Sequence, residues 1–138
     1  MNIYFAASIR WWRDDRELYL QMIQHLQQYG KVLTEHIADP DLNDENMTDH
    51  QIWEMDMKRL DECDIVVAEV TQPSIWVWYE LGRAEQLWKK IIPLYREGWK
   101  KKVSAMISGN PNHPTYYYQT IHEAKEILNI IFDHDPQS

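Results

Sequence analysis

Glu80 is the residue whose setting points most directly to chemistry. An apolar run at residues 65–70 ends in a short polar loop, and a helical pattern then places Glu80 in its second turn. Open α/β proteins bind their ligands where such buried strands end. A carboxylate there would serve as a nucleophile or a proton carrier, although the spacing fits a solvated helix carboxylate equally well. Gly82, in mid-helix, would permit a close backbone approach.

Asp56 is a second carboxylate in a helical segment and has two interpretations. It lies between Met55 and Met57 and precedes Arg59 by three residues, so it would form a surface ion pair on an amphipathic helix. Alternatively it faces Glu80, and the two carboxylates then form the pair of nucleophile and acid/base that glycosidases use. The spacing alone favours the surface ion pair.

Several polar residues follow the predicted strands and would meet at one edge of a parallel sheet. These residues are Ser8 and Arg10 after the first strand, His36 after the second, Ser74 after the third, and Arg96 and Ser104 after the fourth. Arginine and serine side chains beside helix N-termini suit a phosphate or a sugar. A metal site between His36 and His50 is disfavoured, because the acidic loop at residues 38–49 has no fixed ligand spacing.

The elements that would position these groups alternate between strand and helix. We predict strands at residues 2–7, 31–34, 65–70, 91–95 and 116–119, helices at residues 14–29, 50–62, 74–89 and 120–132, and a helical turn at residues 103–107. The expected fold is α/β, a single-domain, doubly wound, flavodoxin/Rossmann-like parallel sheet of four to five strands with helices on both faces. The domain would span residues 1–138, with a loose tail at 133–138. Pro93 predicts that its strand is short, bulged or at an edge.

Composition excludes several classes of function. A net charge of −8 argues against nucleic-acid binding. A single cysteine excludes a disulfide framework and a cysteine-based zinc site, and fits the cytoplasm. No apolar run approaches the length of about 20 residues that spans a membrane, and the N-terminus does not read as a signal peptide. Neither GxGxxG nor GxxxxGK[ST] occurs, so no dinucleotide or P-loop site is indicated.

Motifs along nearly the whole chain carry a resemblance to a known family. These motifs are YFAASIR (4–10), VLTEH (32–36), Asp56, DIVVAEVTQPS (64–74), YELGRA (79–84) and VSAMISG (103–109). They closely resemble the 2′-deoxynucleoside 5′-monophosphate N-glycosidases of the Rcl type, which belong to the nucleoside 2-deoxyribosyltransferase superfamily. The resemblance implies hydrolysis of the N-glycosidic bond to a free nucleobase and 2-deoxyribose 5-phosphate.

The resemblance also implies roles for individual residues. Glu80 would be the nucleophile that forms a glycosyl–enzyme ester, Asp56 the general acid/base, and Tyr4 a catalytic residue that positions Glu80. The implied substrate-binding residues are Ser8, Ile9, Arg10, Ser74, Ser104 and Met106. Ser104 and Met106 would reach the site of a neighbouring subunit, so a homodimer with a shared active site is implied, with no metal and no cofactor.

Four tryptophans depart from the pattern of this family. Trp11, Trp12, Trp76 and Trp78 stand where the family carries glycine. These rings would form a subunit interface, narrow the pocket and change the substrate, or block the phosphate site.

Three alternatives to the hydrolase therefore stay open. They are a nucleoside 2-deoxyribosyltransferase, in which a second base replaces water, an N-glycosidase acting on CMP-type ribonucleotides, and a non-catalytic nucleotide-binding or assembly protein with a pocket closed by tryptophan.

Overall fold

The protein folds around a five-stranded parallel sheet with the strand order β2-β1-β3-β4-β5. A computed structural model describes residues 1–8, 12–34, 46–98 and 102–135, with the side chains of residues 12–14 outside the description. The strands are β1 (Asn2–Ala6), β2 (Lys31–Val32), β3 (Ile65–Glu69), β4 (Lys90–Arg96) and β5 (Tyr116–Tyr118). The helices are α1 (Trp12–Leu26), α2 (Asp49–Glu62), α3 (Ile75–Gln86), α4 (Ala105–Ser108) and α5 (Ile121–Asp133). This order of parallel strands confirms the predicted doubly wound α/β fold.

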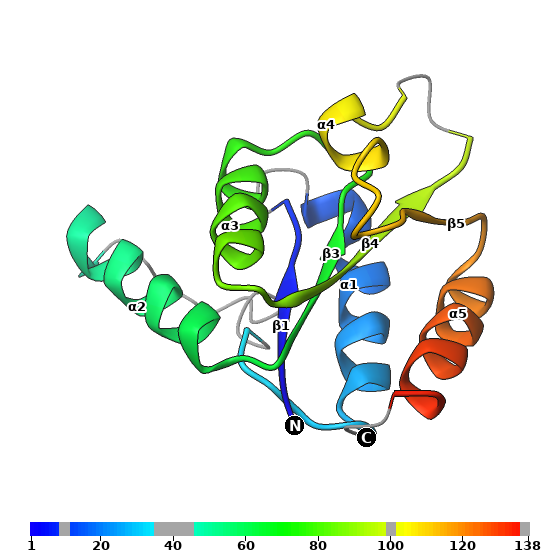
Figure 1. Ribbon diagram of the computed structural model, residues 1–138, viewed down its shortest axis with the longest axis horizontal. Helices are drawn as coiled ribbons and strands as arrows, with labels where there is room; N and C mark the ends of the chain where they lie inside the picture. Colours follow the sequence, from blue (N-terminus) through cyan, green and yellow to red (C-terminus); the bar gives the residue numbers. More distant parts are fainter. Residues whose placement is uncertain (9–11, 35–45, 99–101, 136–138) are drawn as a thin grey trace.

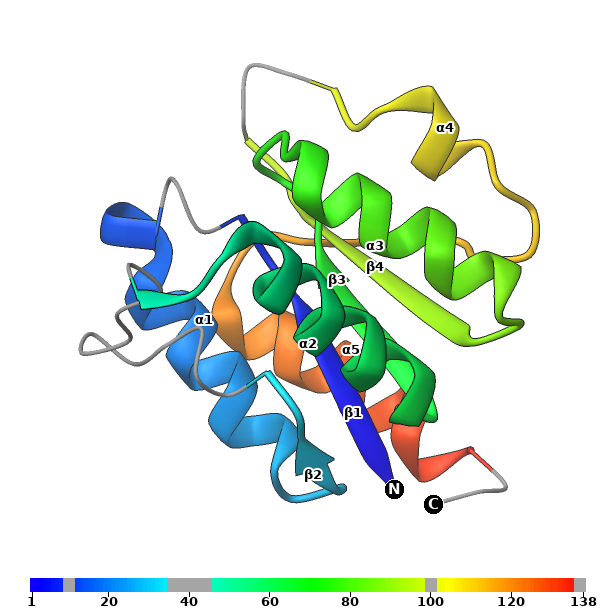
Figure 2. The same ribbon diagram turned by 90° about the vertical axis from the view of Figure 1, so that its left-hand side faces the viewer.

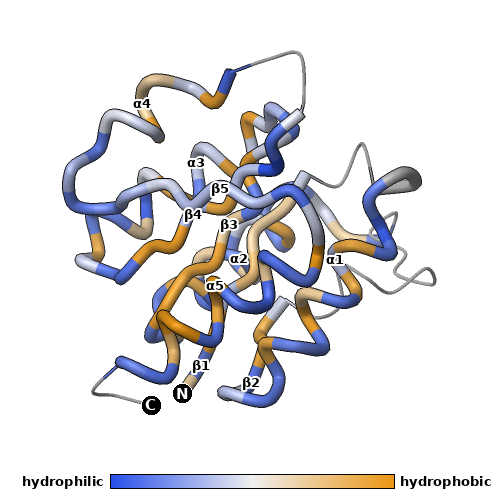
Figure 3. Tube along the Cα trace, turned by 90° about the vertical axis from the view of Figure 1, so that its right-hand side faces the viewer, coloured by the Kyte–Doolittle hydropathy of each residue, from blue (hydrophilic) through white to orange (hydrophobic). Residues whose placement is uncertain are grey.

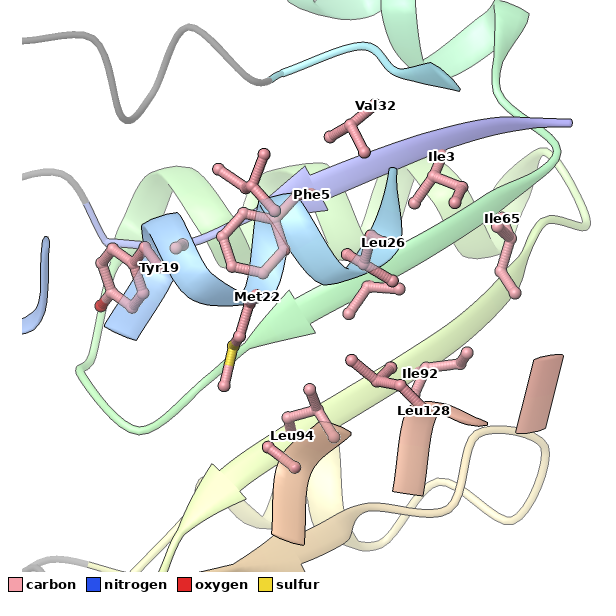
Figure 4. Close-up of a cluster of buried hydrophobic side chains, with 14 of the residues drawn as sticks. Ile3, Phe5, Tyr19, Met22, Leu26, Val32, Ile65, Ile92, Leu94 and Leu128 are labelled. Carbon is pink, nitrogen blue, oxygen red and sulfur yellow. The ribbon is translucent and has the colours of Figure 1, made fainter. Parts of the chain in front are cut away.

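Two helical layers cover the sheet, as Figure 1 shows, with α1 and α5 on one face and α2 and α3 on the other. Figure 2 shows α2 and α3 running side by side over the strands. The first face buries Phe5, Leu26, Ile92 and Leu128, among other apolar side chains, between the sheet and α1 and α5 (Figure 4). The central strands are mostly apolar along their length, whereas apolar and polar residues alternate along the outer helices (Figure 3).

Helix starts follow the capping chemistry of the sequence. Thr48 and Thr120 each form a capping box with the residue three positions on, at the starts of α2 and α5. The Ser74 hydroxyl accepts a hydrogen bond from the Val77 amide at the start of α3. The N-terminus of α3 is therefore fixed at the end of the loop that follows β3, six residues before Glu80.

The prediction that the strand of Pro93 is short, bulged or at an edge was wrong for β4 as a whole. β4 has seven residues and lies between β3 and β5, although Pro93 is within it. β5 pairs only with Leu94–Arg96, so at Pro93 the strand has a neighbour on the β3 side alone. The missing amide of proline is tolerated there because β4 is locally an edge.

The predicted helix at residues 14–29 extended too far at its C-terminal end. α1 ends at Leu26, and a turn follows it. A Cβ atom at Gly30 would lie 2.3 Å from the carbonyl oxygen of Met1, so glycine is required there by the close passage of two backbone segments.

The carboxyl ends of the parallel strands meet at one edge of the sheet, on the side of α4 (Figure 1). β1 lies between β2 and β3, and the chain leaves β1 and β3 toward opposite faces of the sheet. This switch point between β1 and β3 is where an open α/β sheet forms its ligand crevice.

Candidate active site

Glu80 is buried at the switch point and is held by Tyr4. Its carboxylate is on the inward side of α3, and the whole residue is only 5% exposed. The Tyr4 hydroxyl donates a hydrogen bond of 2.7 Å to Glu80 Oε1. A charged carboxylate in such a place is held by specific partners and not by solvent, so the interpretation of Glu80 as a solvated helix residue was wrong.

The surroundings of Glu80 favour its protonated form. Burial raises the pKa of Glu80 to about 8, and the charge of Asp56 acts in the same direction. Hydrogen bonds from Tyr4 and from the Trp76 side chain lower that pKa and offset part of the effect of burial. Burial and the charges of Glu80 and Asp56 also raise the pKa of the Tyr4 phenol, which stays a hydrogen-bond donor across the physiological range.

Asp56 faces the same site and is not the surface charge that one interpretation predicted. It is 6% exposed on the inward face of α2. Arg59 Nη1 lies 3.6 Å from Asp56 Oδ1, so the predicted ion pair with Arg59 is present, and Asp56 is the more deeply buried partner. Because Asp56 shifts the pKa of both Glu80 and Tyr4, the two carboxyl groups form one interacting pair.

Two of the predicted serines follow the strands β1 and β3 that form the switch point. Ser8 follows β1 and is 2% exposed, and Ser74 caps the N-terminus of α3. Both therefore lie at the carboxyl edge of the neighbouring strands β1 and β3. Ile9, Arg10 and Trp11, as well as His36, lie outside the described residues, as does the side chain of Trp12.

Ser104 and Met106 line a different pocket of the same chain. This pocket, of about 350 Å³, lies between α3 and the α4 segment, and its lining includes Trp78 and Gly82 but neither Tyr4, Asp56 nor Glu80. Met106 is 86% exposed, and the Ser104 hydroxyl accepts from the Met106 amide as the cap of α4. Within one chain, these two residues do not join the carboxylate pair.

Gly82 borders open space, so the predicted close backbone approach at this position was wrong. A Cβ atom built at Gly82 would meet no atom within 4 Å. Gly82 lines the pocket beside Ser104 and Met106, so a larger side chain here would project into that pocket.

Trp76 and Trp78 have different surroundings. Trp76 is one helical turn before Glu80 and interacts with its carboxylate, so its ring stands at the candidate active site. Trp78 lines the pocket of Ser104 and Met106. Both rings are a little over two-fifths exposed, which leaves much of each indole open to a ligand or to another protein surface.

A further buried acid, Glu69, was not among the candidates from the sequence. It stands inside the apolar run of β3 and is 1% exposed. Arg96, which was predicted to face the ligand, instead pairs with Asp15 through a 2.8 Å contact on the α1 side of the sheet. An acidic residue within an otherwise apolar strand was the sequence signal for this network.

Neither a metal site nor a membrane span is found among the described residues. No group of three or more His, Cys, Asp or Glu side chains in that part of the chain is arranged to hold a metal ion. None of the helices described is both long enough and apolar enough to cross a bilayer.

The fold and the carboxylate pair define an α/β protein with a site suited to glycosidic chemistry, and comparison with known proteins gives its family. Residues 3–125 match the family described as Nucleoside 2-deoxyribosyltransferase, and the chain belongs to that family. A relative from Danio rerio, named 5-hydroxymethyl-dUMP N-hydrolase, is 44% identical over 95% of this chain and 93% of its own length. A Trichoplax adhaerens relative, named Putative 2′-deoxynucleoside 5′-phosphate N-hydrolase 1, is 41% identical over 88% of this chain and 85% of its own.

Solved structures confirm the fold. The CMP N-glycosidase BcmB of Clostridium botulinum matches with a TM-score of 0.67 at 21% identity, over 95% of this chain and 99% of that one. A 2-desoxiribosyltransferase from Leishmania mexicana matches with a TM-score of 0.58 at 15% identity, over 96% of this chain and 97% of its own. At these identities the likeness concerns the arrangement of the strands and helices.

Proposed function

We propose that this protein hydrolyses the N-glycosidic bond of 2′-deoxynucleoside 5′-monophosphates and releases a free nucleobase and 2-deoxyribose 5-phosphate. The observation that carries the proposal is the buried pair of Glu80 and Asp56, with Tyr4 hydrogen bonded to Glu80, in a chain that is more than two-fifths identical, over the aligned residues, to relatives named as N-hydrolases. The names of these relatives indicate which bond is broken and that the substrate carries a phosphate. The site indicates which side chains act on that bond.

In the first step, Glu80 attacks the anomeric carbon of the deoxyribose. The bond from this carbon to the base nitrogen breaks, its electron pair leaves with the base, and Asp56 supplies the proton that neutralises the departing base. The positive charge that develops on the sugar is stabilised by the Glu80 carboxylate, as in O-glycoside hydrolysis. The 2-deoxy sugar lacks an electron-withdrawing hydroxyl, so this charge forms more easily.

In the second step, water replaces Glu80. Asp56, now ionised, takes a proton from a water molecule, whose oxygen attacks the anomeric carbon and breaks the ester to Glu80. The pair needs one proton in total before the reaction. Burial and the charge of Asp56 favour that proton on Glu80 in the resting site, so it must pass to Asp56 before Glu80 attacks.

Tyr4 contributes by holding Glu80. Its hydroxyl donates to Oε1 at 2.7 Å, which orients the carboxylate and favours its ionised form. After the ester forms, the same donor can remain on the carbonyl oxygen. Tyr4 is therefore a catalytic residue of the proposed site.

The phosphate would bind at the carboxyl edge of β1 and β3. Ser8 and Ser74 lie there, and Ser74 is at a helix N-terminus, where backbone amides and the helix dipole favour an anion. Ile9 and Arg10 follow Ser8 in the sequence and are proposed as further ligands of the sugar and the phosphate.

The active form is proposed to be a homodimer. Ser104 and Met106 line a pocket whose lining does not include Glu80, which supports a role for them in the site of a neighbouring subunit. Apolar side chains on α3 and α4 are exposed enough to form the contact, with Ile75 and Met106 both 86% exposed and Trp78 beside them. We place this dimer, with one domain per chain, in the cytoplasm, as its single buried cysteine suggests.

The test is a survey of substrates with chromatography of the products. The protein is incubated with deoxynucleosides, deoxynucleotides and ribonucleotides, each with and without an added acceptor base. Free base from deoxynucleoside monophosphates alone supports the proposal. A new nucleoside in the presence of the acceptor would instead show a transferase, base from CMP a ribonucleotide glycosidase, and no turnover a binding protein.

A further inference from the structure

A second buried polar network lies on the opposite face of the sheet from Glu80. Its centre is Glu69, the last residue of β3, whose side chain shares a face with Ile65 and Val67. Tyr19 of α1 lies beside the carboxyl ends of β1 and β3, as Figure 4 shows. The network therefore lies on the α1 side of the sheet, next to the loops that follow β1 and β3.

Glu69 is connected to the loop after β3 through Thr71. Glu69 Oε1 accepts the Thr71 amide at 3.1 Å and also the Thr71 hydroxyl. That hydroxyl oxygen in turn accepts the amide of Arg96 at 2.8 Å. Carboxylate, hydroxyl and the end of β4 thus form one chain of hydrogen bonds that fixes Thr71.

The network contains more polar groups than the hydrogen bonds among the described residues satisfy. Asp15 Oδ2, Glu69 Oε2 and the hydroxyls of Tyr19 and Tyr118 are buried without a hydrogen-bond partner in the described structure. Burial raises the pKa of Glu69 to about 7, against the lowering effects of Thr71 and Arg96. A carboxyl group in this setting destabilises the fold relative to an apolar side chain. Glu69 therefore contributes through the segment that it holds in place and not through the stability of the fold.

The segment that Glu69 holds leads directly to Ser74. Thr71 and Gln72 are buried, and Ser74 begins α3 three residues after Thr71. We propose that Glu69, acting through Thr71, is a positioning residue that sets the Ser74 end of the loop against Ser8 and so determines how tightly the 5′-phosphate binds. This inference rests on the proposed function, because Ser74 is assigned to the phosphate there.

The effect should fall on binding and not on the chemical step. Glu80 is fixed independently of this network, by α3 and by Tyr4 from the other face of the sheet. A displaced Ser74 would weaken the contacts to the phosphate in the ground state and the transition state alike, which raises KM and leaves kcat nearly unchanged.

Two substitutions of Thr71 provide a matched test. Thr71→Val keeps the shape and removes both hydrogen bonds of the hydroxyl, whereas Thr71→Ser keeps the hydroxyl. We expect Thr71→Val to raise KM for a deoxynucleoside monophosphate about tenfold, the equivalent of one lost hydrogen bond, with kcat within about threefold. Thr71→Ser should stay within about twofold of the wild type. If Thr71→Val does not fold, it is replaced by Glu69→Met, which removes the carboxylate that accepts the hydrogen bonds of Thr71.

Binding of inorganic phosphate, measured by calorimetry, separates this inference from the proposed function. We expect Thr71→Val to weaken phosphate binding by the same factor as it raises KM, whether or not the wild type turns over a nucleotide. Equal KM and phosphate affinity in Thr71→Val and the wild type would overturn the inference, as would a loss confined to kcat. A wild type that binds phosphate but hydrolyses nothing would overturn only the proposed function, and one that binds no phosphate would overturn both.

Discussion

The hydroxyl of Tyr4 and the carboxylate of Glu80 are joined by a buried hydrogen bond of 2.7 Å, although 76 residues separate them in the chain. The bond connects β1, an inner strand of the sheet, to the second turn of α3. It fixes the carboxylate at the switch point, where the sheet opens to a ligand. A site built on rigid elements in this way can hold a reacting carboxylate in one orientation.

Removal of the Tyr4 hydroxyl tests the first consequence of this bond. Tyr4→Phe removes a donor that lowers the pKa of Glu80, so that pKa should rise further. We expect the descending limb of the profile of kcat/KM against pH, where the pair loses its last proton, to move to higher pH, and kcat to fall roughly 10- to 100-fold, as for a hydrogen bond to a charged group. An unchanged pH profile would show that Tyr4 does not act on Glu80.

Replacement of Glu80 should change how stability depends on pH. The pKa of Glu80 is raised in the folded protein from 4.5 to about 8, so folding is favoured by the protonated form. The stability of the wild type is therefore lost in part as the pH rises from about 4.5 to above 8. Glu80→Gln removes this dependence, and Tyr4 can still donate to the amide oxygen.

We expect the midpoint of thermal unfolding of Glu80→Gln to exceed that of the wild type by a few degrees at pH 9 and to match it near pH 4. A difference of equal size at both pH values would contradict the assignment of this titration to Glu80.

Trp76 and Trp78 should separate in their effects on activity. Trp76 donates to Glu80, so Trp76→Phe, which keeps the aromatic bulk and loses the N–H group, should raise the pKa of Glu80 and move the descending limb to higher pH. Trp76→Ala should show the same movement together with a change in KM as the site widens. Trp78 lines the other pocket, so Trp78→Phe is the control, and its profile of kcat/KM against pH should be unchanged. Equal profiles for Trp76→Phe and Trp78→Phe would show that Trp76 does not contact the nucleophile.

A shared active site can be detected by mixing two inactive variants. Glu80→Gln lacks the proposed nucleophile, and Ser104→Ala lacks the group assigned to the partner's site. In a mixed dimer one of the two sites would have both Glu80 and Ser104, so random exchange of equal amounts should restore about a quarter of the wild-type activity. Failure to restore activity, while mass measurements show that mixed dimers form, would place Ser104 and Glu80 in the same chain.

The alternation of apolar runs and helical patterns was sufficient to predict the parallel sheet and both helical layers. The bounds were less accurate where a tertiary contact decides them. Gly30 follows the residues predicted as helix, but it is needed for the passage of Met1. Pro93 was taken to mark a short, bulged or edge strand, but β4 has seven residues and lies between β3 and β5, and Pro93 is at an edge only locally because β5 does not reach it. Neither contact is local in the sequence.

The site shows the same division. Glu80 and its strand–loop–helix setting were visible from spacing, and the family motifs added Asp56 and Tyr4. The burial of Asp56 could not be predicted from its helix, because Arg59 and two methionines fit an exposed pair as well. Glu69 was overlooked because a single acid in a strand gives no sign of its partners, which come from α1, β4 and the loop after β3.

The most direct measurement of the central claim is the release of free base from a deoxynucleoside 5′-monophosphate by the wild type, by Glu80→Gln and by Glu126→Gln. Glu126 is an exposed acid of α5 on the opposite face of the sheet, so its variant carries the same chemical change away from the site. We predict steady release by the wild type and by Glu126→Gln, and a loss of at least about a thousandfold in Glu80→Gln, as for other lost nucleophiles. Release by Glu80→Gln at a rate close to that of the wild type would contradict the account.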